Sequence, residues 1–412
     1  MGGWVALAAL MVAIGALAEA PGLLLIAAIT LGYGTLTRIW TRYGAGRVEY
    51  QRHLGSTRAV AGDTVALDIS IWNRKRLPLP WIAADDPITD GIVVSERPIM
   101  ERDNEHIDRR VLRNAWALAW YERVVRHFHL EARRRGVYEF GPVRIQVRDI
   151  LGRHAGSGEI AGEDTLVVSP RSVRLALRGR DAAPIGERRA RQSLFADPAL
   201  FGGVRPFQPG DSIRRVHWRA TARLGSPVSR RFEPARGRVV MIALDVQTLP
   251  GPHWEMTYDD GAFESLCVAA VSLARQLLDE GASCGIAAAG FTGTMQRVAY
   301  LPPQAAHGQL ARIAGLLART GPVSSGPYPA LLTWLTRRVP PGCVVLTLSV
   351  RDPRSYLPAM QRLARNGYPV EHVALGADGP GHAAAARRAG IRARSASLDP
   401  NWEEADALVL AG

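Results

Sequence analysis

The sequence predicts a multi-domain protein with an N-terminal transmembrane helical hairpin, a small β-sandwich-like domain and a doubly wound α/β domain. Three observations support this order: two uncharged apolar runs open the chain, short strands with alternating apolar residues follow, and strands then alternate with helices. At 412 residues the chain is long enough for two or three domains. The predicted boundaries are residues 1–42 for the hairpin, 47–170 for the β-rich domain, 171–235 for a connector with a turn and a helix, and 236–412 for the α/β domain.

The two apolar runs are Trp4–Ala18 and Leu23–Thr37, each about 15 residues long against the ~20 residues of a full helical span. Flanking residues extend each run toward spanning length, so we expect a tight hairpin of two short transmembrane helices. Arg38, Arg42 and Arg47 follow the second run, and basic residues favour the cytoplasmic side. The sequence therefore predicts a multi-pass protein of the cell (plasma) membrane whose soluble domains are cytoplasmic.

A cleaved signal peptide is the alternative interpretation of the same start. The residues Ala18-Glu19-Ala20 resemble a small-x-small cleavage site. No basic residue precedes the first apolar run, however, and a second apolar run follows the supposed cleavage point. We therefore prefer the hairpin.

Short strands are predicted from Arg47 to about Pro170. Val65, Leu67, Ile69 and Ile71 alternate with small or polar neighbours in Thr64–Trp72, and Trp116, Leu118 and Trp120 share one face of Ala115–Trp120. Arg126–Ala132, Gly136–Phe140 and Val143–Val147 are further predicted strands. Frequent turns between short strands are typical of a small β-sandwich. His127 and His129 share a strand face, but the sequence offers no nearby carboxylate or third ligand, which disfavours a metal site.

The connector begins with Arg171–Gly203, where periodicity is weak, and continues into a predicted turn and helix. Pro209 and Gly210 suit the central positions of a type II turn, and Asp211 stands where a helix N-cap is expected. Ile213, Val216, Ala220 and Leu224 form one apolar stripe of a helix that Gly225 and Pro227 end.

The other face of this predicted helix is basic. Arg215, Arg219 and Arg223 follow one another at i+4, a spacing at which like charges cost roughly 0.2–0.5 kcal/mol per pair. Arg214 lies four residues before Trp218, within reach for stacking on the indole. Two readings remain open: an intramolecular seam of salt bridges, or a docking surface for an acidic domain, partner protein or anionic lipid.

Together, the residues Arg205, Phe207, Pro209-Gly210-Asp211, Arg214, His217-Trp218 and Ala222-Arg223 resemble the signature of the domain-of-unknown-function 58 family. The candidate interaction residues are Arg205, Phe207, Pro209, Gly210, Asp211, Arg214, Arg215, His217, Trp218, Arg219 and Arg223. Phe207 stands where tyrosine is expected as often, and the segment from Arg133 to Gly152 also resembles the family. The resemblance implies a membrane-anchored bacterial protein with a von Willebrand factor A-like domain. It further implies work beside a MoxR-type AAA ATPase in envelope-associated chaperone or complex-assembly roles.

The last domain is predicted to begin with Arg238–Val246, a buried parallel strand that ends near Asp245, followed by a helix over Ala262–Gly281. The further predicted strands are Cys284–Ala289, Arg297–Leu301 (an edge strand), Cys343–Ser349 and Val370–Leu375, and the further helices are Gln309–Arg319, Ala330–Arg338, Pro358–Asn366 and His382–Ala389. Strands that alternate with helices favour a parallel, doubly wound sheet.

The resemblance to von Willebrand factor A-like domains implies a divalent-ion site built on a DxSxS run. Asp245 is present here, but Gln247 and Leu249 occupy the two serine positions. Leucine supplies no oxygen, and a cation such as Mg²⁺ requires about six oxygen ligands. We therefore expect a degenerate site with no metal, and no cofactor.

Composition narrows the function further. The formal net charge is +13, carried almost entirely by arginine, since Lys75 is the only lysine. Such a chain favours anionic membrane surfaces, whereas no nucleic-acid-binding motif is present. The sequence contains three widely spaced cysteines, no phosphate-binding loop and no GxSxG motif.

These features predict a non-enzymatic protein-interaction module. The alternatives are a metal-dependent, adhesin-like ligand binder and a hydrolase that uses His217 with Asp211.

Overall fold

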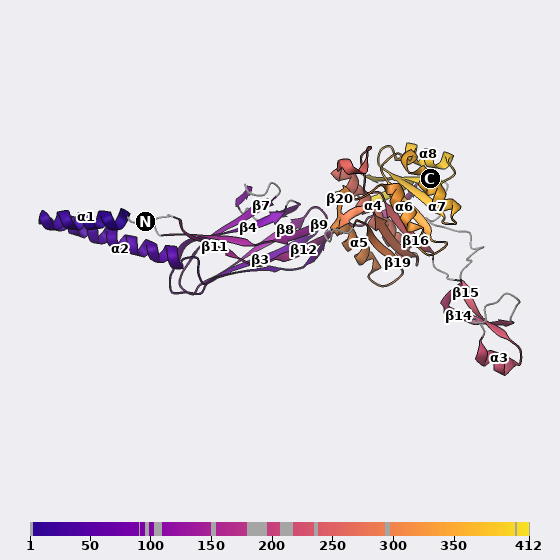
Figure 1. Ribbon diagram of the computed structural model, residues 1–412, viewed down its shortest axis with the longest axis horizontal. Helices are drawn as coiled ribbons and strands as arrows, with labels where there is room; N and C mark the ends of the chain where they lie inside the picture. Colours follow the sequence, from indigo (N-terminus) through magenta and orange to yellow (C-terminus); the bar gives the residue numbers. More distant parts are fainter. Residues whose placement is uncertain are drawn as a thin grey trace. The chain divides into compact units, whose positions relative to one another are not determined.

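The protein is described from a computed structural model, which divides into two units, Met1–Ser169 and Pro170–Gly412 (Figure 1). The structure describes residues 3–89, 91–94, 99–102, 109–149, 154–178, 196–206, 217–234, 238–292, 297–399 and 402–411. Each unit has its own hydrophobic core.

The first unit begins with two helices that pack side by side, α1 (Gly3–Leu17) and α2 (Pro21–Tyr43) (Figure 1). The turn between them places Glu19 at φ 45°, and Pro21 opens α2, where its missing N–H costs no helical hydrogen bond. Large apolar side chains are exposed along both helices. They are Leu7, Leu10, Val12, Ile14, Leu17, Leu24, Leu25, Ile26, Ile29, Leu31, Leu36, Ile39 and Tyr43.

Only one helix in the described residues is long and apolar enough to cross a membrane by length and composition, and it is Asp260–Asp279 of the second unit. That helix is 67% buried over its apolar window, as expected for a core helix. The apolar stretches of the N-terminal pair, Ala6–Leu17 and Pro21–Thr37, are shorter. Membrane spanning by the hairpin therefore stays a prediction.

The rest of the first unit consists of three sheets. The four-stranded sheet has the order β1 (Val48–Leu54), β3 (Thr64–Asn73), β8 (Arg123–Ala132), β5 (Ile92–Val94). The five-stranded sheet has the order β11 (His154–Ile160), β10 (Val143–Arg148), β4 (Leu79–Thr89), β7 (Arg109–Leu118), β6 (Ile99–Arg102). The small sheet has the order β2 (Arg58–Val60), β12 (Asp164–Ser169), β9 (Gly136–Phe140). Alternate side chains of the two larger sheets meet in one core that includes Leu67, Ile69, Ile82, Ile145 and Val147.

Most of the predicted strands of this unit are confirmed, including Thr64–Trp72, which lies in β3. One prediction is wrong in an instructive way. The strand with Trp116 and Leu118 ends at Leu118, so Trp120 lies in the following turn and is 66% exposed. Side chains hold the turn that follows: Asn73 donates to the carbonyl of Ala119 at 2.7 Å, and Glu122 accepts from the backbone N–H of Ala119 at 2.6 Å.

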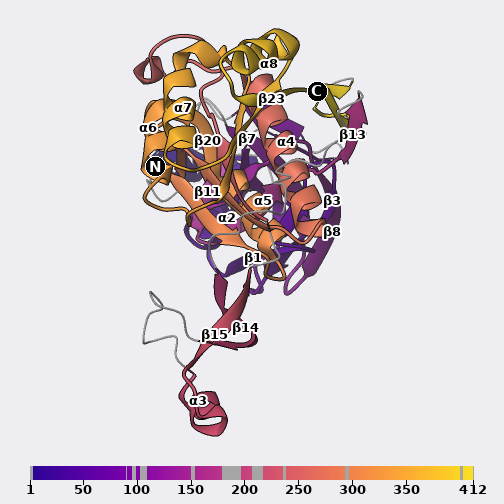
Figure 2. The same ribbon diagram turned by 90° about the vertical axis from the view of Figure 1, so that its right-hand side faces the viewer.

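The second unit contains an eight-stranded sheet covered by helices on both faces (Figure 2). Its strand order is β13 (Arg174–Arg178), β24 (Ala407–Ala411), β23 (Arg392–Asp399), β22 (Val370–Leu375), β21 (Val344–Ser349), β16 (Val239–Leu244), β17 (Ser283–Ala288), β19 (Ala299–Gln304). The five strands from β23 to β17 are parallel, and β19 is an antiparallel edge, as predicted for that segment.

Two helices cover one face of this sheet, α4 (Asp260–Asp279) and α5 (Gln309–Arg319). Three cover the other face, α6 (Tyr328–Leu335), α7 (Leu357–Arg365) and α8 (Gly379–Arg388). The remaining elements are the short helices η2 (His253–Glu255) and η3 (Pro353–Ser355), the pair β18 (Gly290–Thr292) and β20 (Thr320–Ser324), and the pair β14 (Ala196–Pro206) and β15 (Val228–Pro234) with α3 (Trp218–Leu224).

The structure corrects the prediction for the start of the connector, which contains a strand. Arg174–Arg178 forms strand β13, which pairs parallel with β24 at the edge of the sheet. Weak periodicity hid this strand because Val173, just before it, is buried, whereas Arg174 is exposed and Leu175 and Ala176 are both only partly buried. The residues that follow, 179–195, lie outside the described residues.

Candidate functional site

The carboxyl ends of β16 and β21 meet where the strand order reverses, the place at which open α/β sheets usually bind ligands. Leu244 of β16 pairs with Leu348 of β21, so the next residues, Asp245 and Ser349, lie side by side. The Ser349 hydroxyl donates to Asp245 Oδ2 at 2.8 Å. Arg351 reaches the same carboxylate oxygen with Nε at 2.9 Å and Nη2 at 2.8 Å.

This ion pair is almost fully buried, with Asp245 at 1% exposure. Burial raises the pKa of Asp245 to about 6, although the guanidinium of Arg351 acts to lower it. Tyr356 donates to the backbone carbonyl of Arg351 at 3.1 Å, and Tyr328 packs edge-on against Tyr356 at 5.1 Å. The arginine is therefore held at the edge by the packing around it.

The residues at this edge do not fit a divalent cation. The Gln247 amide donates to the carbonyls of Leu249 and Gly251, so its nitrogen points toward the loop backbone. Thr248 Oγ1 accepts from the backbone N–H of Asp259 at 2.7 Å. In the part of the chain that the structure describes, no group of three His, Cys, Asp or Glu side chains is placed to hold a metal. A guanidinium already supplies the positive charge beside Asp245.

Six of the candidate interaction residues lie outside the described residues: Phe207, Pro209, Gly210, Asp211, Arg214 and Arg215. Arg205 lies in β14, opposite Ser229 of β15. The backbone N–H of His217 donates to the carbonyl of Val228 at 2.9 Å, and α3 begins only at Trp218. The prediction of a continuous helix from Asp211 is therefore wrong at His217. In such a helix the N–H of His217 would donate to a carbonyl of the same helix, but here it donates to Val228 of β15.

Three candidate residues lie together on α3: Trp218, Arg219 and Arg223. Trp218 is 67% exposed, and both arginines are exposed. One side of α3 is held by β15, because Thr221 Oγ1 accepts from the backbone N–H of Val228 at 3.2 Å. The result is a short helix that is fixed on one side and presents an indole and two guanidinium groups to solvent on the other.

The three cysteines are poorly placed to act as nucleophiles. Cys267, Cys284 and Cys343 are buried, and desolvation raises the pKa of Cys284 and Cys343 to about 12. His127 pairs with Asp68, Nδ1 to Oδ1 at 2.7 Å, which supplies a carboxylate that the sequence did not reveal. This pair is exposed on a strand face and lacks a third ligand in the described residues.

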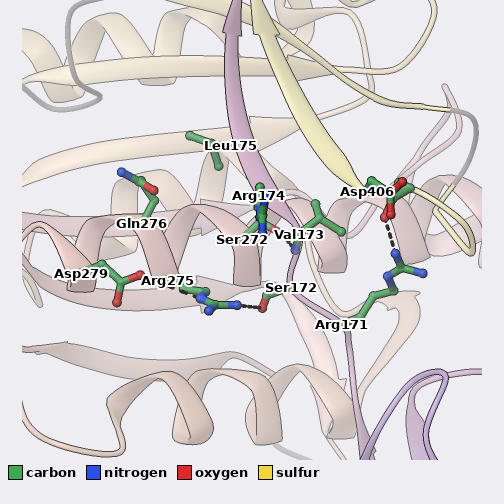
Figure 3. Close-up of a pocket in the computed structure, with 11 residues that line it drawn as sticks. Arg171, Ser172, Val173, Arg174, Leu175, Ser272, Arg275, Gln276, Asp279 and Asp406 are labelled. Carbon is green, nitrogen blue, oxygen red and sulfur yellow. Dashed lines mark hydrogen bonds and ion pairs between the residues drawn. The ribbon is translucent and has the colours of Figure 1, made fainter.

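A groove of about 620 Å³ runs between β13 and α4 (Figure 3). Its polar groups already bond to one another: Val173 N–H donates to Ser272 Oγ at 2.9 Å, and Arg275 donates to Ser172 Oγ at 3.1 Å. Arg171 donates to the carbonyls of Glu403 and Ala405. These hydrogen bonds indicate that the groove is the contact by which the chain at β13 is held against its neighbours, rather than a ligand site.

Two important residues were missed from the sequence alone, Arg351 and Lys75. Arg351 follows a predicted strand by two residues, but its contact with Asp245 depends on β16 and β21 being neighbours. Lys75 lies in a turn, and its ammonium donates to the carbonyls of Gly44 at 2.7 Å and Gly46 at 2.5 Å. Its uniqueness as the only lysine was the one available signal.

Comparison with known proteins gives one family and one curated relative. Residues 203–340 match the family described as "Protein of unknown function DUF58". "Uncharacterized protein YeaD" of Bacillus subtilis (strain 168) is 23% identical over 247 residues, which are 58% of this chain and 55% of that protein. The chain thus spans about half the length of this relative. The resemblance to the domain-of-unknown-function 58 family is confirmed for the matched residues.

Similarity to solved structures is weak. The CARDB domain of the PF1109 protein of Pyrococcus furiosus is 12% identical, with 29% of this chain and 89% of that chain covered and a TM-score of 0.19. A cohesin module from Clostridium perfringens is 8% identical, with 31% and 98% covered and a TM-score of 0.23. Scores this low carry no argument about fold or function.

Proposed function

We propose that this protein is a membrane-tethered, non-enzymatic interaction module whose α3 surface binds a protein partner. The observation that carries the proposal is the exposed indole of Trp218 beside the exposed Arg219 and Arg223. Tryptophan and arginine are the residues that most often dominate protein–protein binding energy, and a large indole left in water gains free energy when a partner covers it. The α3 surface is defined as these three residues.

A partner of acidic character fits the charge of the α3 surface. The family resemblance points to a MoxR-type AAA ATPase, acting with this protein in envelope-associated chaperone or complex assembly. In this proposal the second unit serves as a von Willebrand factor A-like scaffold. Its ligand-binding edge is filled by the Asp245–Arg351 pair, which supports contact rather than metal-dependent binding as the mode of action.

The tether in this proposal is the hairpin of α1 and α2. Helices that expose apolar side chains on every face are stable when buried in protein or in lipid. The C-terminal part of α2 is fixed to the β-rich part of the first unit. Tyr33, near the end of the apolar stretch, donates to Asp149 Oδ2 at 2.9 Å, and Trp40 Nε1, beyond that stretch, donates to the carbonyl of Pro78 at 3.0 Å. The exposed Arg42 and Arg47 that follow support a cytoplasmic position for both units.

The test is capture of a MoxR-type AAA ATPase on full-length protein in membranes. A triple variant, Trp218→Ala with Arg219→Glu and Arg223→Glu, is expected to lose the ATPase while folding normally. The matched control, Trp254→Ala with Arg312→Glu and Arg365→Glu, makes the same chemical changes at exposed positions elsewhere in the second unit and should retain it.

Equal capture by both variants would contradict the α3 surface as the binding site. Unfolding of the α3 variant alone would show that the surface is structural. The tether has its own test: a phosphatase reporter fused after Gly46 should remain inactive, since the proposal places that residue in the cytoplasm. A rise in melting temperature with Mg²⁺ that Asp245→Ala abolishes would instead favour the metal-dependent binder.

A further inference from the structure

One end of the first unit gathers the turns that lie next to the end of α2. Lys75 bonds to the carbonyls of Gly44 and Gly46, directly after α2, and the backbone N–H of Tyr121 donates to the carbonyl of Lys75 at 3.2 Å. The Asn73 side chain bridges the same two turns through the carbonyls of Leu77 and Ala119. We call this region, residues 40–49, 72–81 and 117–123 with Arg148, the collar.

Aromatic side chains concentrate in the collar. Trp120 is 66% exposed and Tyr121 is 57% exposed at the tip of the β7–β8 turn. Trp40, Pro78, Pro80, Ala117 and Ala119 line an apolar hollow of about 370 Å³ beside them. Water-exposed indole and phenol groups next to an apolar hollow are costly on a soluble surface, and tryptophan and tyrosine are enriched where protein meets the lipid headgroups.

Arginine side chains surround these aromatic residues. Arg148 stacks over the ring of Trp81 at 4.2 Å, and Arg74 stacks over the ring of Trp72 at 4.6 Å. The exposed arginines of the collar are Arg42, Arg47, Arg74, Arg76, Arg123 and Arg148, whereas its acidic residues in the described chain are Glu49 and Glu122. Glu49 is paired with Arg74, and Glu122 accepts from the backbone N–H of Ala119. The collar therefore presents a strong positive charge.

We propose that the collar lies in the headgroup layer of an anionic membrane and forms a second contact with lipid beside the hairpin. The proposal rests on the membrane tether proposed above and goes beyond it, since a tether alone does not require the β-rich part to touch lipid. Continuity with α2 supports lipid as the occupant: the apolar stretch of the hairpin ends at Thr37, three residues before Trp40 of the collar.

The charge of the collar points to the same occupant. Each basic residue near an anionic bilayer adds to the attraction, and the bonds of Lys75 to the carbonyls of Gly44 and Gly46 hold its turn at the end of α2. The collar then sets the orientation of the first unit relative to the membrane. The hairpin attaches the protein to the membrane, and the collar orients it there.

The test uses full-length protein in liposomes with a polarity-sensitive fluorophore on a new cysteine. Ala119→Cys places the probe in the collar and keeps Trp120 and Tyr121, whereas Glu163→Cys places it at the exposed opposite end of the first unit, beside the β12 strand. The native cysteines are buried, and the parent protein treated with the same fluorophore controls for labelling at them. We expect a blue shift and quenching by headgroup-labelled lipid at position 119 and neither at position 163.

A second set of measurements tests whether charge attracts the collar to lipid or whether the hairpin merely holds it near the membrane. Adding phosphatidylglycerol to phosphatidylcholine should increase the quenching at position 119. Arg42→Gln with Arg76→Gln and Arg123→Gln should abolish that increase, while Arg58→Gln with Arg133→Gln and Arg134→Gln, exposed arginines of the opposite end, should leave it unchanged.

The outcomes distinguish the two proposals. Protein that floats with the liposomes but shows the same signal at positions 119 and 163 overturns the collar and leaves the tether standing. Failure to float overturns both. A blue shift at position 119 without any lipid means that a second copy or another protein segment covers the collar, which also overturns lipid as its occupant.

Discussion

Arginine has opposite roles at two places in the second unit, the strand edge at Asp245 and the α3 surface. Arg351 is nearly buried, with 11% of its side chain exposed, and its guanidinium bonds to a carboxylate that is itself buried. Arg219 and Arg223 lie in water beside an exposed indole. The first arginine completes the fold from within, whereas the other two remain available to a partner. Charge alone therefore does not separate a structural arginine from a candidate binding residue; exposure and pairing do.

The largest expected effect tests the buried side of this comparison. Arg351→Leu leaves the carboxylate of Asp245 buried without its cation, which should lower the free energy of unfolding by about 3–5 kcal/mol at neutral pH. The double variant Asp245→Asn with Arg351→Leu removes both charges and should recover most of the loss. Urea denaturation measures both. A loss below about 1 kcal/mol for the single variant would mean that water or another group replaces the guanidinium.

The pH dependence of the same variant sharpens the test. The pKa of folded Asp245 is raised to about 6, so the folded state binds this proton more tightly than the unfolded state. Ionisation of Asp245 therefore costs stability as pH rises through about 6. Without Arg351 the pKa should rise further, so the penalty should shrink at acidic pH. A penalty independent of pH would point to lost packing instead.

His372 should also make the free energy of unfolding depend on pH, but in the opposite direction to Asp245: acid should destabilise the folded state. Burial lowers its pKa to about 4, with Thr347 Oγ1 at 3.0 Å from Nδ1, the ring of Tyr356 nearby and His382 as a further cationic influence. An unfolded histidine binds a proton below about 6.5, so the folded state should lose about 2 kcal/mol on going from pH 7 to pH 5. His372→Leu should lack this loss, and the difference between the two proteins removes the opposing contribution of Asp245.

Lys75→Met tests the clamp between α2 and the β-rich part. The substitution leaves the carbonyls of Gly44 and Gly46 without their shared donor, which should cost about 1–3 kcal/mol. Hydrogen exchange of the amides of residues 44–47 measures the local loss. Arg76→Met, at the exposed neighbouring position, is the matched control and should change stability by less than about 0.5 kcal/mol.

How far the sequence predicted these features depends on the range of the interaction. Gln309–Arg319 was predicted to the residue, because helical periodicity is a local signal. The position of Arg351 was not predictable in the same way, since strand order places two segments about 100 residues apart side by side. Trp120 was assigned to a strand because the alternation continued past Leu118, whereas the turn depends on bonds from Asn73 and Glu122 to the backbone of Ala119.

The α3 surface illustrates the same limit. The residue pattern identified Trp218, Arg219 and Arg223, and it also predicted one helix from Asp211. The backbone bond from His217 to Val228 contradicts that helix, because pairing with a later strand competes with local helix formation. Residue identity was therefore a better guide to the candidate surface than predicted secondary structure was.

The smallest expected effect on stability is also the most informative about function. Arg219 and Arg223 are i+4 neighbours on α3, and their repulsion costs roughly 0.2–0.5 kcal/mol. Arg219→Glu replaces that repulsion with an attractive pair in the favourable order, so the free energy of unfolding should stay the same or rise slightly. Capture of the proposed ATPase partner should nevertheless fall, because under the proposal this partner would meet a carboxylate in place of a guanidinium. A variant that is as stable as the parent and binds equally well would place the binding surface elsewhere; one that loses stability would show that Arg219, like Arg351, is part of the fold.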